Sequence, residues 1–180
     1  MMIKALIFTL LSTILPNETL SVTDNFSISN RQIMWQKVFE TSLPVEQIIE
    51  NIRYSGYFDH IAVHGDYLTA EINMLSIDHR NYESQTGTGA PLFALSHHVK
   101  AYAIIDFKKG KYRVTIKSIK LTPQTISGDY SNRIMDLAEL ALENDNAQFR
   151  DTFFRKRSKI LNFTFLQITD FTDTPGLDDW

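Results

Sequence analysis

Apolar and polar side chains alternate on both sides of Lys109-Gly110, and no other feature of the sequence constrains the fold as strongly. A two-residue turn at this dipeptide pairs Lys108 with Lys111. The register then places apolar cross-strand pairs on one face: Phe107 with Tyr112, Ile105 with Val114, and Ala103 with Ile116. The other, mostly polar face carries Asp106 with Arg113, Ile104 with Thr115, and Tyr102 with Lys117. A slip of one residue would bury the polar set, so the pattern predicts this register.

A second, shorter hairpin is predicted with its turn at Gly65-Asp66. Its buried side would hold Val63 opposite Leu68 and Ile61 opposite Ala70. Its other side would hold His64 with Tyr67, Ala62 with Thr69, and His60 with Glu71. The pair of His60 and Glu71 is interpreted as a cross-strand ion pair.

Helical spacing appears on either side of the two hairpins. Residues 31–40 favour a strand, and a helix begins at Pro44, with apolar residues at Val45, Ile48, Ile49 and Ile52. After the hairpins, the spacing predicts a helix over 131–143 and another that starts near Ala147. The run 162–169 suits a strand by its aromatic and β-branched content and a helix by its context, so its conformation is left open.

This order of elements predicts an α+β fold. An antiparallel sheet of about five strands has one apolar face that must be covered, and the helices are expected to pack on that face. The chain has 180 residues, of which 43% are apolar and 22% charged, which is typical of one globular domain. We expect the domain to span 31–172, with a linker at 22–30 and a frayed tail at 173–180.

The first 21 residues have the layout of a secretory signal peptide. Met1 to Lys4 carries one positive charge, Ala5 to Leu15 is apolar, and a cleavage site is expected near Ser21. An N-terminal strand or core helix is the alternative interpretation. The chain contains no cysteine, so acylation as a bacterial lipoprotein is excluded, and no later segment is long and apolar enough to cross a membrane. We therefore expect a soluble exported protein, periplasmic or secreted.

Two stretches carry a resemblance to a known family. They are Trp35-Gln36-Lys37-Val38-Phe39 with the Leu43-Pro44 helix start, and Phe107-Lys108-Lys109-Gly110-Lys111-Tyr112-Arg113-Val114. In this order they resemble domains of unknown function with a TATA-binding-protein-like fold from exported Bacteroidota proteins. The resemblance covers about residues 31–160 and implies a helix-packed antiparallel sheet whose other face is exposed as a shallow saddle. It implies no catalytic or ligand-binding residues.

The exposed sheet face is the predicted binding site. Its proposed binding residues are His60, Thr69, Glu71, Lys100, Tyr102, Arg113 and Lys117. The long connection 76–96, which contains the run QTGTGAP, is predicted to take part in binding as well, because connections of that length are usually functional, disordered or both. The expected partner is a protein or glycan of the cell envelope. A solvated sheet face with opposite charges paired across strands is the alternative interpretation.

Other functions are predicted less strongly by the residues. Segment 100–120 holds seven basic residues against Asp106, but the whole chain has a net charge of −3, so we expect no nucleic-acid partner. His60 and His64 lie too far apart along a strand to share an ion, and we expect no metal and no cofactor. A non-catalytic protein is favoured over an enzyme. The rival hypothesis is a small periplasmic hydrolase that uses Asp78 with His79 on the loop, and a structural module or inhibitor is a third.

Overall fold

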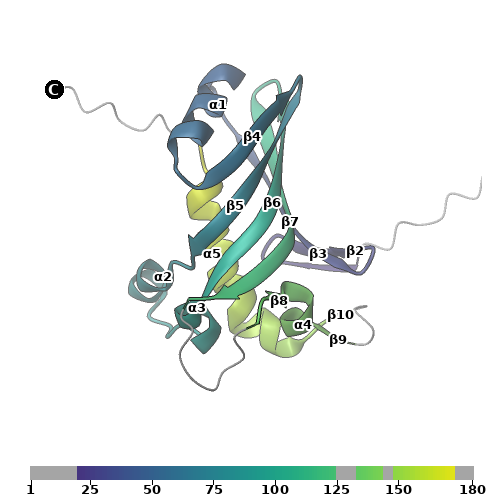
Figure 1. Ribbon diagram of the computed structural model, residues 1–180, viewed down its shortest axis with the longest axis vertical. Coiled ribbons are helices and arrows are strands. Elements are labelled where there is room, and N and C mark those ends of the chain that lie inside the picture. Colours follow the sequence, from purple (N-terminus) through teal and green to yellow (C-terminus); the bar gives the residue numbers. More distant parts are fainter. Residues whose placement is uncertain (1–19, 125–132, 144–147, 173–180) are drawn as a thin grey trace, which may run out of the picture.

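The computed structural model describes residues 20–124, 133–143 and 148–172, and shows one antiparallel sheet curled around a helix (Figure 1). The strands lie in the order β1-β2-β3-β7-β6-β5-β4, and β8 pairs with β7. Their bounds are β1 Leu20–Thr23, β2 Phe26–Ser29, β3 Gln32–Glu40, β4 Phe58–His64, β5 Tyr67–Ser76, β6 His97–Lys108, β7 Lys111–Pro123 and β8 Met135–Asp136. A separate pair is formed by β9 (Leu142–Glu143) and β10 (Gln148–Phe149).

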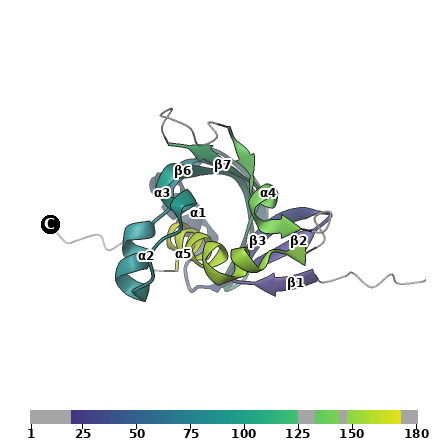
Figure 2. The same cartoon turned by 90° about the horizontal axis from the view of Figure 1, so that it is seen from below.

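The helices lie between and after these strands. Their bounds are α1 Val45–Tyr54, α2 His79–Thr86, α3 Leu92–Ser96, α4 Leu137–Ala141, the π-helical turn η1 Phe153–Arg157, and α5 Ser158–Thr169. Figure 2 shows the sheet curving around α5, with α1 also inside the curve. The α+β class and the packing of helices on one sheet face are therefore confirmed, but the sheet has eight strands rather than about five.

The predicted register of the second hairpin is confirmed from Lys108–Lys111 to Tyr102–Lys117. Its apolar set, including Ile105, Val114 and Ile116, is fully buried against the helices. Beyond Tyr102 the register shifts at a bulge, where Ser118 has a φ of 54°, and Lys100 then lies opposite Lys120.

The first hairpin differs from its prediction at one end. The pairs His64–Tyr67, Val63–Leu68 and Ala62–Thr69 are confirmed. His60 has a φ of 51° and occupies a bulge, so Asp59 lies opposite Glu71 and the predicted pair of His60 with Glu71 is wrong. Val63 is also not buried: it is 43% exposed, because β4 is the edge strand of the sheet and no described segment pairs with its other side.

Residues 162–169, whose conformation the sequence leaves open, are helical and belong to α5. Packing of this helix against the sheet explains why. The ring of Phe165 lies 5.6 Å from that of Trp35, and Leu161 and Ile168 are buried on the same helix. The Trp35 indole N–H donates to Asn162 Oδ1 at 2.8 Å. The concave side of the sheet therefore packs against the apolar residues of α5, which recur at helical spacing.

Three other predicted segments are corrected. Residues 22–30 are not a linker: most of them form β1 and β2, and Phe26 is fully buried against Phe153 with ring centroids 5.4 Å apart. The connection 76–96 contains α2 and α3. The described part of 131–143 forms β8, α4 and β9 rather than one helix.

Three predicted features fall outside the described residues. These are the signal peptide apart from its last residues, the start of a helix near Ala147, and the tail 173–180.

The hydroxyl of Tyr112 on β7 hydrogen-bonds the backbone at the C-terminal end of α5. Tyr112 is 1% exposed, and its hydroxyl donates to the carbonyl of Thr169 at 2.9 Å and accepts from the N–H of Phe171 at 2.7 Å. Burial raises the pKa of Tyr112 well above its usual range, and the neighbouring Asp170 acts in the same direction. This hydroxyl therefore satisfies two backbone groups where the helix ends.

Candidate binding face and cleft

The outer face of the sheet carries three cross-strand rows of side chains. In register across β5, β6 and β7, the rows are Tyr67–Asp106–Arg113, Thr69–Ile104–Thr115 and Glu71–Tyr102–Lys117. We call these nine residues the outer face. They alternate along each strand with core residues, and the curl of the sheet around α5 leaves eight of them partly or fully exposed. Thr115 is buried on this side, where its hydroxyl accepts from the side-chain amide of Gln36 on β3 at 3.0 Å.

Short-range contacts organise this face. Arg113 and Asp106 form an ion pair at 2.9 Å, and their side chains are 49% and 33% exposed. The Lys117 ammonium lies 5.5 Å from the centroid of the Tyr102 ring, a cation–π arrangement. The ring of Tyr67 stacks on His64 of the edge strand, with centroids 5.0 Å apart. The face therefore presents aromatic rings and charges together.

Six of the seven residues predicted for binding lie on this side of the sheet. Thr69, Glu71, Tyr102, Arg113 and Lys117 belong to the rows, and Lys100 lies next along β6, opposite Lys120. His60 does not join them, because its bulge removes it from the strand pairing. The residue opposite Glu71 is Asp59, so two carboxylates occupy the end of that row.

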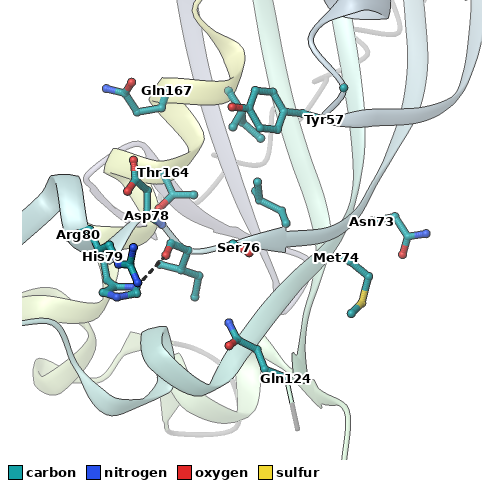
Figure 3. A pocket seen from close by; sticks show the side chains of 14 residues that line it. Tyr57, Asn73, Met74, Ser76, Asp78, His79, Arg80, Gln124, Thr164 and Gln167 are labelled. Carbon is teal, nitrogen blue, oxygen red and sulfur yellow. Dashed lines mark hydrogen bonds between the residues drawn. The ribbon is translucent and has the colours of Figure 1, made fainter.

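A cleft of about 600 Å³ lies beside the C-terminal end of β5 (Figure 3). Its walls come from the turn between α1 and β4, from the start of α2, from α5 and from the end of β7. The residues that line it are Gly56, Tyr57, Asn73, Met74, Leu75, Ser76, Ile77, Asp78, His79, Arg80, Gln124, Thr164, Gln167 and Ile168.

The cleft exists because β5 is longer than β4. The last β4–β5 pair is Phe58 with Ile72, whereas β5 continues to Ser76 with β6 as its neighbour. A bulge at this point gives Met74 a φ of 55°. Beyond the strand, the Asp78 N–H donates to Thr164 Oγ1 at 3.1 Å and holds the chain against α5.

Asp78 and His79, the two residues of the hydrolase hypothesis, both line the cleft. The polar contacts of their side chains, however, are with residues two or three positions away in the sequence. The Asp78 carboxylate accepts from the N–H and the side-chain amide of Asn81, at 3.3 and 2.8 Å, as the cap of α2. His79 Nδ1 lies 3.3 Å from the carbonyl oxygen of Ile77 (Figure 3). In the described part of the chain no hydrogen bond joins the carboxylate of Asp78 to the imidazole of His79.

Most of the cleft residues were not anticipated from the sequence. Tyr57, Gln124 and Gln167 come from three distant segments and belong to no motif. The only signal was the length of the connection 76–96, whose first residues form one wall.

The described residues contain neither a cluster of metal-ligating side chains nor a membrane-spanning helix. Within 20–124, 133–143 and 148–172, no group of three or more His, Cys, Asp or Glu side chains is arranged to hold a metal ion. The helices in the same ranges include none that is long and apolar enough to span a bilayer.

Comparison with known proteins adds one structural likeness. No family model matches the chain, and no curated protein is significantly similar to it. The crystal structure of a TBP-like protein from Parabacteroides distasonis is similar with a TM-score of 0.44 and 9% sequence identity. The likeness covers 79% of this chain and 94% of that one.

Proposed function

We propose that the protein is a non-catalytic binding module. It uses the outer face of the sheet and the segment 76–96 to bind a protein or glycan partner. The observation that carries this proposal is the set of three in-register rows on a sheet whose helix α5 packs against the opposite side. Such a face mixes aromatic rings, which supply contact area, with charges that orient a partner.

The energetics of the outer face support a role in binding rather than in stability. Exposed ion pairs such as Arg113 with Asp106 contribute about 0–1 kcal/mol to folding. The contact of Lys117 with Tyr102 contributes about 0.5–1 kcal/mol at an exposed site. These side chains therefore add little to the free energy of unfolding, whereas a partner that desolvates them would gain more from each.

The cleft geometry supports a non-catalytic function over the hydrolase alternative. A general acid or base must lie within hydrogen-bond reach of its proton partner. The Asp78 carboxylate instead caps α2, and the imidazole nitrogen Nδ1 of His79 faces a backbone carbonyl. This use of both side chains favours a structural role for them.

Export is part of the proposal. Its support is the charged start and apolar run of residues 1–15. Expression of the full chain in a bacterial host and mass determination of the protein in the periplasm or medium test it. A product that begins near residue 22 is expected, and a full-length product found only inside the cells would contradict export.

The binding proposal is tested with the double variant Tyr102→Ala/Lys117→Ala. Immobilised protein is used to capture partners from an envelope fraction of the cells that produce it. We expect the variant to lose the captured partner while its melting temperature stays nearly unchanged. The matched control Tyr54→Ala/Lys109→Ala removes the same two residue types from exposed positions elsewhere, and it should capture normally. Retained capture by the first variant would show that the outer face is not the site.

A further inference from the structure

We propose that the free edge of β5 in the cleft binds an extended peptide as an additional strand. The inference rests on the proposed function, since it assumes that the protein binds a partner, and it names the chemistry of that partner at the cleft. The ligand is a short peptide segment in extended conformation that carries an acidic side chain.

The edge of β5 is open only where the cleft lies. From Tyr67 to Ile72 the strand pairs with β4 on one side and β6 on the other. After Ile72 its partners among the described residues lie on one side alone, through Leu75 with Val99 and Ser76 with His98. Figure 1 shows β5 continuing toward α2 beyond the start of β4. An unpaired edge of this kind presents backbone N–H and C=O groups to an incoming strand.

The strand alternation indicates which residue offers these groups. Tyr67 flanks the two-residue turn and exchanges backbone hydrogen bonds with His64, so every second residue from Tyr67 faces β4 and the residues between face β6. Ile72 therefore faces β6. The bulge at Asn73 and Met74 adds one residue, after which Leu75 faces β6 again. Ser76 consequently directs its N–H and C=O away from β6 and into the cleft.

The cleft has the space and the flanking side chains for such a segment. Its volume of about 600 Å³ falls within the usual range of ligand pockets, and it lies where β4 would continue if that strand were longer. Tyr57 and Met74 are 46% and 47% exposed on either side (Figure 3). Alternate side chains of an extended peptide point to opposite faces of the sheet, and these two residues would contact them.

Charge in the cleft indicates the acidic character of the peptide. Arg80 is exposed at the start of α2, and within the described ranges no carboxylate lies within 4.0 Å of its guanidinium. Among the described residues that line the cleft, Asp78 supplies the one carboxylate, and this carboxylate accepts hydrogen bonds from Asn81. A peptide carboxylate would therefore find a free cation that can bind it with two hydrogen bonds.

The bulge argues against a second copy of the chain as the occupant. A long, flat edge favours pairing between sheets of two molecules, whereas a bulge twists the edge and limits the pairing length. Here the open stretch runs only from Asn73 to Ser76 and includes the left-handed residue Met74. A flexible peptide can follow this short edge more readily than a second folded sheet can.

The experiment compares Ser76→Pro with Ser76→Ala. Both remove the hydroxyl that lies 3.3 Å from His98 Nδ1, but only proline removes the backbone N–H that faces the cleft. Proline is tolerated at an edge strand where that N–H is free, so the variant is expected to fold, as checked by circular dichroism and melting temperature. Octapeptides are selected from a random phage-displayed library on the wild-type protein, and their Kd values are measured by fluorescence anisotropy.

We expect selected peptides to be enriched in Asp and Glu. Their Kd should rise about tenfold in Ser76→Pro and less than about twofold in Ser76→Ala, because one backbone hydrogen bond is lost in the first variant alone. Arg80→Gln should raise the Kd of acidic peptides, and N-methylation of the peptide amides should abolish binding.

Several results would overturn the inference. These are a failure to select any peptide, equal affinity for Ser76→Pro and wild type, an equal loss in Ser76→Ala, or a homodimer that dissociates when Ser76→Pro is introduced. The outer-face variant Tyr102→Ala/Lys117→Ala should bind the peptides normally. If Ser76→Pro also binds them normally while the outer-face variant loses its envelope partner, strand addition is wrong and the proposed function stands.

Discussion

Substitution of Tyr112 by Phe tests how the end of α5 is held. The change removes one hydroxyl and keeps the ring, which stacks on Phe39 with centroids 5.0 Å apart. The Phe171 N–H and the Thr169 carbonyl then lose their hydrogen-bond partner in a buried site. A buried polar group left without a partner costs about 1–3 kcal/mol. Since two groups are affected and the loosened chain end can reach water, we expect a loss of about 2–3 kcal/mol.

Thermal and urea unfolding measure this loss. For a domain of this size, 1 kcal/mol changes the melting temperature by about 2–4 °C, so a decrease of about 4–12 °C is expected. Tyr82→Phe is the matched control: Tyr82 is also a buried ring, packed 5.7 Å from Phe163, but no described residue hydrogen-bonds its hydroxyl. It should change the melting temperature little. At about 2 °C per kcal/mol, a decrease of less than 1 °C would correspond to a loss below about 0.5 kcal/mol. Such a small decrease for Tyr112→Phe would show that the hydroxyl does not stabilise the helix end as described.

The same residue predicts a pH dependence. Burial raises the pKa of Tyr112 in the folded protein, so the folded state disfavours its ionised form. The stabilising contribution is fully present below the unfolded pKa of about 10 and is lost as the pH rises above it, because only the unfolded state then releases the proton. We expect the wild type to lose stability faster than Tyr112→Phe between about pH 10 and 11, at up to about 1.4 kcal/mol per pH unit. Parallel stability curves for the two proteins would contradict this.

Three further substitutions test other parts of the structure. Phe26→Ala should destabilise the protein by about 3–5 kcal/mol in urea unfolding, since its fully buried ring contacts Phe153 and Phe165; a linker position would tolerate the change. Asp78→Ala should cost about 0.5–2 kcal/mol through loss of the α2 cap, and hydrogen exchange should speed up in α2 first; unchanged exchange there would refute the capping role. Arg113→Ala should change the free energy of unfolding by less than about 1 kcal/mol, as expected for an exposed ion pair, and a larger loss would mean that the outer face contributes to folding.

Much of the sheet was predictable because its determinants are local. The turn at Lys109-Gly110 and the alternation around it determine which residues face each other, and the observed pairs match over the whole span from Tyr102 to Lys117. Helix α1 was predictable for the same reason, since Pro44 and the apolar spacing act within one or two turns. The outer face followed from the same alternation, and six of its seven predicted binding residues do lie together on that side.

The candidate sites depend on bulges and long-range contacts that local residue patterns do not specify. His60 left the predicted face because of a bulge, and nothing in the residue types around it marks a φ of 51°. The cleft could not be predicted as a site, because Tyr57, Ser76 and Gln167 meet only after the sheet has curled around α5. The connection 76–96 was recognised by its length alone, and its helices carry no strong apolar period.

The sequence by itself determined the two hairpins, their register next to the turns and the polar character of one sheet face, because alternation and turn chemistry act over a few neighbouring residues. It did not determine the bulges that shift the register farther from each turn. Only the tertiary structure decided that residues 22–30 belong to the sheet, since Phe26 is buried by Phe153 and Phe165 from the far end of the chain. It also decided that 162–169 is a helix, because a concave sheet buries Leu161, Phe165 and Ile168 on one side of it. Burial by distant partners is a property of the assembled fold, and the local pattern cannot specify it.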